Sequence, residues 1–128
     1  AKLQNFCYNP NYKIVEFCKR KGIPTICFPR GLDKNYLKFN EIVKPDGINL
    51  DCNLDPIWAK QKLTNVTLQG GLNPQTLLKP EKEMYNEAKK YLDTFKNVPY
   101  IFNLGHGLVP ETKPDKVEKL IKFVRDYK

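Results

Sequence analysis

Hydrophobic residues follow two alternating periods along this chain. Helical spacing appears first within residues 11–21, where Ile14, Val15 and Cys18 fall on one face. Short apolar runs typical of buried strands occur at residues 24–28, 46–51, 65–70 and 99–105. Helical spacing returns at residues 33–43, from Asp55, at residues 81–96 and after Thr112. The pattern therefore predicts the element order α-β-α-β-α-β-α-β-α.

Polar residues mark three of the expected helix starts. Asp55 and Asn73 each stand directly before a proline, so the side chain can cap the helix while proline occupies its first turn. Thr112 stands two residues before Pro114, and its hydroxyl is expected to reach a backbone N–H near Asp115. These capping residues and prolines predict that helices begin directly after the second, third and fourth strands.

The alternation of strands and helices predicts an α/β fold with parallel strands and right-handed crossovers. An open flavodoxin-like sheet satisfies this pattern, and so does half of a (β/α)8 barrel. One feature favours the barrel, because polar and glycine-rich residues follow the strands, where barrel enzymes collect their chemistry. These residues are Arg30-Gly31, Asp51, Gln69-Gly70-Gly71 and Gly105-His106-Gly107.

Length and cysteine content limit the class of protein. The 128 residues fit one domain, residues 1–128, and the chain shows neither a transmembrane run nor a secretory signal. The chain begins at Ala1 rather than Met, so a fragment of a longer protein or a processed product is expected. Four irregularly spaced cysteines and a single histidine are wrong for known zinc sites and favour a reduced, cytoplasmic protein.

The net charge of +8 raises the question of a nucleic-acid partner. Lysine supplies most of this charge and falls on the expected solvent faces of helices, while the chain has three arginines. No RNA-binding motif with paired aromatic residues is present. A solvated lysine surface, and no nucleic-acid partner, is the expected outcome.

His106 is the main candidate for chemistry. Glycines on both sides would let a large ligand approach the backbone, and an imidazole can donate or accept a hydrogen bond near neutral pH. The chain has no serine, which excludes a Ser-His-Asp triad, and it has neither a G-x-G-x-x-G motif nor a P-loop. Arg30 and Asp51 are ligand contacts, or a loop charge and its partner. Gln69 with Gly70-Gly71 either presents backbone N–H groups to an acid or forms a tight turn.

Three stretches carry a resemblance to a known family. The segments GINLDCNLDP, NVTLQGGLNPQTLL and YIFNLGHGLVPETKPDKVEKLIKFV resemble, in order and separation, the C-terminal part of uroporphyrinogen decarboxylase. The resemblance extends over roughly residues 5–127. It implies the second half of a (β/α)8 barrel, with four parallel strands alternating with helices.

The resemblance also implies a function. The family removes four acetate carboxyl groups from uroporphyrinogen to give coproporphyrinogen, without a metal or an organic cofactor, and it forms homodimers. Its aspartate, tyrosine, substrate-binding serine and arginine-rich motif are absent here, so no catalytic residue is assigned and the chain alone is expected to be inactive. Only the histidine of Leu-Gly-His-Gly carries over, which makes His106 a substrate-binding residue that contacts a carboxylate of the tetrapyrrole.

Departures from the family pattern concern loop geometry. Gly71 and Asn73 stand where the family commonly has Asn and Asp, and Cys52 stands where it often has Trp. Two other functions stay open. Related corrinoid methyltransferases hold zinc through His-x-Cys, but Gly107-Leu108 follows His106. A non-catalytic half-barrel binding or assembly module is the other alternative. Whichever function is correct, exposed strand edges predict that the isolated chain self-associates.

Overall fold

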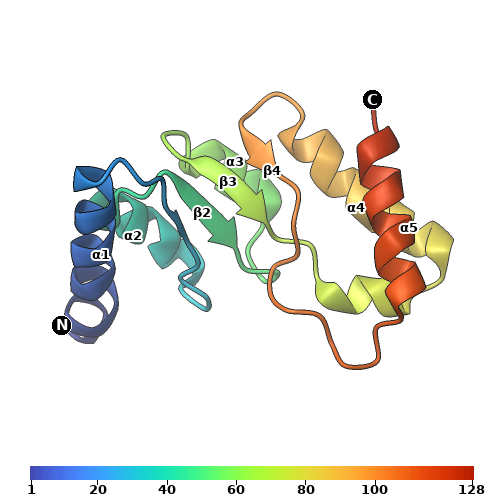
Figure 1. The fold of residues 1–128 in the computed structure, drawn as a ribbon, viewed down its shortest axis with the longest axis horizontal. Helices are drawn as coiled ribbons and strands as arrows, with labels where there is room; N and C mark the ends of the chain where they lie inside the picture. The colour runs from blue at the N-terminus through green and yellow to red at the C-terminus, as the bar shows by residue number, and fades with distance from the viewer.

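The computed structural model describes residues 1–128 and places four parallel strands beside five α-helices (Figure 1). The strands are β1 (Ile26–Cys27), β2 (Gly47–Leu50), β3 (Thr67–Gly70) and β4 (Tyr100–Ile101). The helices are α1 (Asn9–Arg20), α2 (Tyr36–Val43), α3 (Pro56–Lys62), α4 (Glu81–Phe95) and α5 (Pro114–Asp126). Shorter helical turns occupy Gln4–Tyr8, Asp33–Asn35 and Pro74–Leu78. The predicted order of helices and strands is confirmed.

Strand order separates the two folds that periodicity left open. The strands lie side by side in the order β1-β2-β3-β4, and every pair is parallel. A flavodoxin-like sheet reverses its strand order at a switch point, whereas a (β/α)8 barrel adds each strand beside the last. Neighbouring helices also contact in sequence, α1 with α2, α3 with α4, and α4 with α5. The arrangement is therefore that of part of a barrel.

The helices cover one face of the sheet. Ile48, Leu50 and Leu68 point to this face and join the main core cluster with side chains of α1, α2 and α3. Phe95 of α4 stacks on Tyr100 of β4, with ring centroids 4.3 Å apart. This apolar layer explains why the strand runs are rich in aliphatic residues.

The opposite face of the sheet carries no helix. Side chains alternate along a strand, so Asn49 and Gln69 point away from the helices. Asn49 pairs with Gln69, which also pairs with Ile101 on β4, and the pair Gly47–Thr67 lies two residues earlier on the same face. Ile26 belongs to this face through its pairing with Gly47. Ile26 and Ile101 are 51% and 45% exposed, which marks this face as the interior side of an incomplete barrel.

The two outer strands are shorter than the sequence pattern predicted. Ladder pairing covers two residues in β1 and two in β4, against four each in β2 and β3. The expected runs at 24–28 and 99–105 are longer. The reason is that an edge strand has a neighbour on one side only, so fewer of its backbone groups find partners.

Two of the three predicted caps are confirmed. The Asp55 carboxylate accepts the Ile57 N–H at 2.9 Å, and the Asn73 side chain accepts the Gln75 N–H at 3.0 Å. The segment after Asn73 is a 3-10 turn rather than an α-helix, and α4 begins only after Pro80. The third cap is wrong, because α5 begins at Pro114 with Lys113 at the cap position, and the buried Thr112 hydroxyl has no partner.

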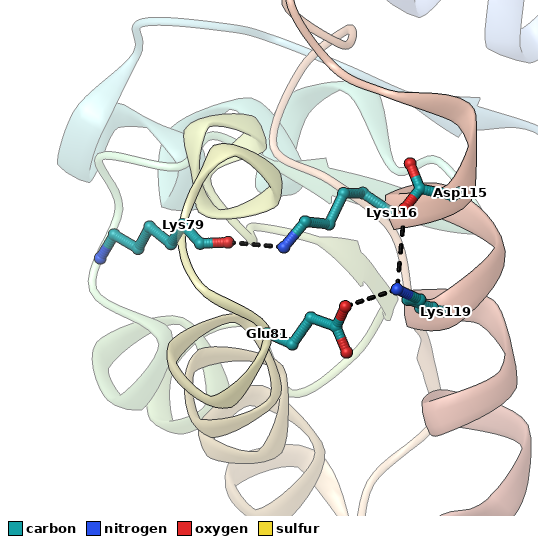
Figure 2. A network of polar contacts seen from close by, with 5 residues as sticks. All are labelled: Lys79, Glu81, Asp115, Lys116 and Lys119. Carbon is teal, nitrogen blue, oxygen red and sulfur yellow. Dashed lines mark hydrogen bonds and ion pairs between the residues drawn. The ribbon is translucent and has the colours of Figure 1, made fainter.

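A set of polar contacts attaches α5 to the start of α4 (Figure 2). The Lys119 ammonium lies 2.5 Å from Glu81 and 3.7 Å from Asp115, and Lys116 donates to the Lys79 carbonyl at 2.8 Å. These side chains are exposed, so they contribute little net free energy and serve mainly to orient the helix. A second apolar cluster of Leu72, Leu77, Met84, Ala88 and Leu120 lies beneath them.

Candidate functional site

The candidate site lies at the edge of the sheet where all four strands end. Parallel strands share the direction of their carboxyl ends, so the residues that follow them meet along this edge. Arg30 follows β1, Asp51 follows β2, Gln69 lies near the end of β3 and His106 follows β4. We name this set the strand-end edge.

Asp51 connects the ends of β1 and β2. Its carboxylate is 5% exposed, and it accepts the Gly31 N–H at 2.9 Å and the Asn53 N–H at 3.3 Å. Burial alone would raise the pKa of Asp51, but these two hydrogen bonds and the nearby charge of Arg30 hold that pKa below its usual value. Asp51 is therefore an ionised group that fixes the loop after β1.

Asn49 and Gln69 form a polar contact on the helix-free face of the sheet. Gln69 donates from Nε2 to Asn49 Oδ1 at 2.8 Å, and the Asn49 amide reaches the Leu104 carbonyl at 3.5 Å. The contact thus connects β2, β3 and the segment after β4. Sequence reasoning singled out Gln69 and missed Asn49, although a polar residue in the middle of the apolar run Gly47–Leu50 was the available signal.

The two glycines after Gln69 lie between the end of β3 and the bridge residue Leu72, so they form no tight turn, and presentation of their N–H groups to an acid stays a prediction. Gly70 and Gly71 adopt φ values of 76° and 104°, which side chains disfavour. The carbonyl of Gly70 accepts the Tyr100 hydroxyl at 2.9 Å, and that of Gly71 accepts the Tyr91 hydroxyl at 2.8 Å. Burial raises the pKa of Tyr91 to about 12, so its hydroxyl stays a donor at neutral pH.

His106 lies in the loop after β4, where its ring makes one hydrogen bond. Nδ1 lies 3.0 Å from the carbonyl oxygen of Gly107, and the ring forms no hydrogen bond or ion pair with Asp51, Gln69 or Arg30. The half-buried imidazole borders a groove of about 500 Å3 between this loop and α5. Phe102, Leu104, Leu108 and Leu120 supply apolar wall to that groove.

Gly105 brings His106 to the rest of the strand-end edge. Its N–H donates to the Leu72 carbonyl at 2.8 Å. A Cβ at Gly105 would lie 2.8 Å from Cys52 Cα and would also overlap Cys52 N, so the loop backbone packs directly on the end of β2. Gly107 is different, because a Cβ there would meet nothing within 4 Å. One glycine allows the close approach of two backbones, and the other leaves open space beside the imidazole.

These groups suit the binding of an anion better than nucleophilic chemistry. His106 and Arg30 can each donate hydrogen bonds to a carboxylate, whereas no thiol lies in hydrogen-bond contact with the histidine. Burial and the adjacent Asp51 raise the pKa of the Cys52 thiol, which keeps it protonated. No group of three or more potential metal-ligating side chains is present.

Comparison with known proteins shows one family. The family model for uroporphyrinogen decarboxylase matches residues 1–127. A uroporphyrinogen decarboxylase from Orientia tsutsugamushi is 38% identical over 130 residues, which cover 98% of this chain and 38% of the relative. The corresponding protein of Rhodospirillum rubrum is 40% identical over 108 residues, covering 84% of this chain and 31% of the relative. That of Cereibacter sphaeroides is 33% identical over 126 residues, covering 95% and 37%. The chain thus spans little more than a third of the length of these relatives.

The close contact at Gly105 predicts that alanine substitutions at Gly105 and at Gly107 differ strongly in their effect on the free energy of unfolding. Gly105→Ala should lower the free energy of unfolding by about 1–3 kcal/mol, because the new methyl group forces the loop away from Cys52. Gly107→Ala is the matched control, and its free energy of unfolding should stay within about 0.5 kcal/mol of the native value. Urea denaturation followed by circular dichroism measures both, and equal effects would contradict the close packing.

The hydrogen bonds of Asp51 predict a pH-dependent contribution to stability. Because the folded pKa lies below that of the unfolded chain, about 3.9, the stabilisation is present above that pH and is lost as pH falls through the folded pKa. Asp51→Asn should cost roughly 1–3 kcal/mol at neutral pH, and the difference from the native chain should shrink in acid. Glu118→Gln, which removes an exposed carboxylate that forms no ion pair, is the control. A difference that is constant from pH 7 to about pH 3 would contradict this assignment.

Proposed function

This chain belongs to the uroporphyrinogen decarboxylase family, and we propose on that premise that it forms part of an enzyme of haem biosynthesis. The reaction removes the four acetate carboxyl groups of uroporphyrinogen III and gives coproporphyrinogen III. The observation that carries the proposal is the family match over residues 1–127 combined with a histidine held between glycines at the strand-end edge. We place the chain as one segment, residues 1–128, forming the C-terminal half of a barrel.

The role of His106 in this proposal is to bind substrate. A protonated pyrrole ring is itself the electron acceptor for loss of CO2, so the protein needs to hold the macrocycle, favour proton delivery and keep water out. His106 would donate a hydrogen bond to one carboxylate side chain, and the open space beside Gly107 would admit the ring system. The groups that the family resemblance links to the pyrrole nitrogens are absent from this chain, and the reaction as proposed uses no cofactor.

The helix-free face of the sheet supports a partner proposal. Ile26 and Ile101 are exposed on that face, and both outer strands have an unpaired edge. We expect a second copy of the chain to cover this surface as a homodimer, since a two-fold contact is the commonest way to close one. No helix has the length and apolarity that crossing a bilayer requires. We also propose that the protein is cytoplasmic and that it has no nucleic-acid partner.

A non-catalytic half-barrel module is the second candidate function. Its support is that the chain forms two hydrophobic core clusters of its own. A module of this kind would bind a tetrapyrrole or another chain through the same strand-end edge. The two candidate functions make different predictions, because only the first requires that this segment works as part of an active decarboxylase.

A chimeric enzyme tests the proposed function. We expect the 128-residue chain alone to form no coproporphyrinogen, and the Orientia tsutsugamushi relative to keep activity when this chain replaces its matching segment. In that chimera His106→Asn should weaken kcat/KM by an amount equivalent to about 1.5–3 kcal/mol while leaving measurable turnover, because one hydrogen bond to a charged group is lost. An inactive but folded chimera would favour the module. Complete loss of turnover in the folded variant would instead assign His106 an essential proton-transfer role.

The exposed inner face predicts concentration-dependent self-association of the isolated chain. Light scattering after size exclusion should give a mass near twice 14.9 kDa at high protein concentration. Replacing Ile101 by Lys on the inner face should shift the equilibrium to monomer, because the charge would be buried in the contact. Ile121→Lys on α5, also exposed, is the control and should leave the dimer intact. A native chain that stays monomeric at high concentration would contradict the proposed homodimer.

A further inference from the structure

Arg30 is a guanidinium group for which the fold supplies no partner. No ion pair of the chain includes it, and its side chain is exposed. Arg20 and Arg125 lie in the last turns of α1 and α5, where a positive charge favours the helix dipole, and Arg125 also borders the groove beside His106. Arg30 follows a strand instead, so helix electrostatics does not account for it.

The backbone that carries Arg30 is held firmly, although the side chain is free. The Arg30 N–H donates to the Phe28 carbonyl at 3.0 Å, and the next residue, Gly31, adopts a φ of 77°. The Gly31 N–H donates to Asp51 at 2.9 Å. A fixed backbone with an unpaired guanidinium is the arrangement expected of a group prepared to bind a ligand.

Asp51 does not neutralise Arg30. One carboxylate oxygen of Asp51 is occupied by the Gly31 N–H and the other by the Asn53 N–H, and the two side chains form no ion pair. The guanidinium is nevertheless close enough to contribute to the lowered pKa of Asp51. Asp51 thus acts as a positioning residue for the turn, while the five N–H donors of Arg30 stay available.

Arg30 and His106 stand at opposite ends of the same strand-end edge. They follow β1 and β4, the two outer strands, which are three interstrand spacings or about 14 Å apart. Two contacts connect them across this width, the hydrogen bond from Gly31 to Asp51 and the packing of Cys52 on Gly105. A ligand that reaches both residues must be broad and must carry anionic groups on more than one side.

We propose that Arg30 binds a carboxylate side chain of the tetrapyrrole, on the opposite side of the macrocycle from the carboxylate bound by His106. This inference rests on the proposed function and extends it to a second binding residue in this chain. The planar guanidinium can hold a carboxylate by two parallel hydrogen bonds, which a lysine ammonium does not reproduce. Asp51 contributes by orienting the loop and does not itself contact the ligand.

Fluorescence titration of the 128-residue chain with uroporphyrin I, the oxidised porphyrin that keeps all the carboxylates, tests the proposal. Arg30→Ala should weaken binding about tenfold, equivalent to about 1.4 kcal/mol. Arg30→Lys should lie between the native chain and Arg30→Ala, because it keeps the charge and loses the bidentate geometry. Asp51→Asn should weaken binding less than Arg30→Ala, and should have no further effect when Arg30 is already alanine. Thermal unfolding by circular dichroism checks that each variant is folded.

Arg20→Ala is the matched control, because it removes the same charge from the end of α1, before β1 begins and therefore away from the strand-end edge. It should change affinity by less than about twofold, which amounts to a few tenths of a kcal/mol. Equal losses in Arg20→Ala and Arg30→Ala would mean that overall charge binds the porphyrin, and would overturn the proposal. Absence of binding by the native chain would also overturn it. The chimera assay judges the proposed function separately, so an active chimera with an ineffective Arg30→Ala would refute only this inference.

Discussion

The register between β2 and β3 sets Ile48 beside Leu68 and Asn49 beside Gln69. Side chains alternate between the faces of a sheet, so this pairing sends the aliphatic pair into the helical layer and the amide pair to the opposite side. A shift of one residue would exchange the two faces, burying amides against the helices and exposing the core. The main core cluster, the polar contact of Gln69 with Asn49 and the open inner face all depend on this one register.

The strand-end edge depends on close approaches that only specific residues permit. Asp51 binds the loop after β1, and Gly105 lets the loop after β4 pack on Cys52. Each contact joins segments that are distant in sequence, so the edge forms only once all four strands are paired. The ionisable groups differ in their surroundings. Asp51 is buried and accepts two backbone N–H groups, whereas Arg30 is exposed without an ion pair and the His106 ring makes one hydrogen bond. At this edge the buried carboxylate is fully hydrogen-bonded, whereas the guanidinium forms no ion pair.

The lysine-rich composition has a structural role distinct from the site. Lysines pair with acids along the outer helices, as Lys89 does with Asp93 and Lys119 with Glu81. These pairs are exposed and arranged along α4 and between α4 and α5, away from the sheet. Because these paired lysines are neutralised by their acids, the net charge of +8 comes from the excess of 22 lysines and arginines over 14 acidic residues. A net charge of this size attracts anions to the surface as a whole.

The sequence by itself determined the order of the elements, because helical and strand periodicities depend on neighbours within a few positions. The caps at Asp55 and Asn73 were predictable for the same reason, and the motif around His106 indicated the family that comparison then confirmed. The predicted cap at Thr112 is wrong because α5 begins one residue later than expected. The packing of α5 decides where that boundary falls. Only the tertiary structure decided the one-sided cover of the sheet, the short outer strands, the pairing of Asn49 with Gln69 and the contact of Gly105 with Cys52. Each of these depends on which segments become neighbours in space, and the local pattern of a chain carries no measure of that.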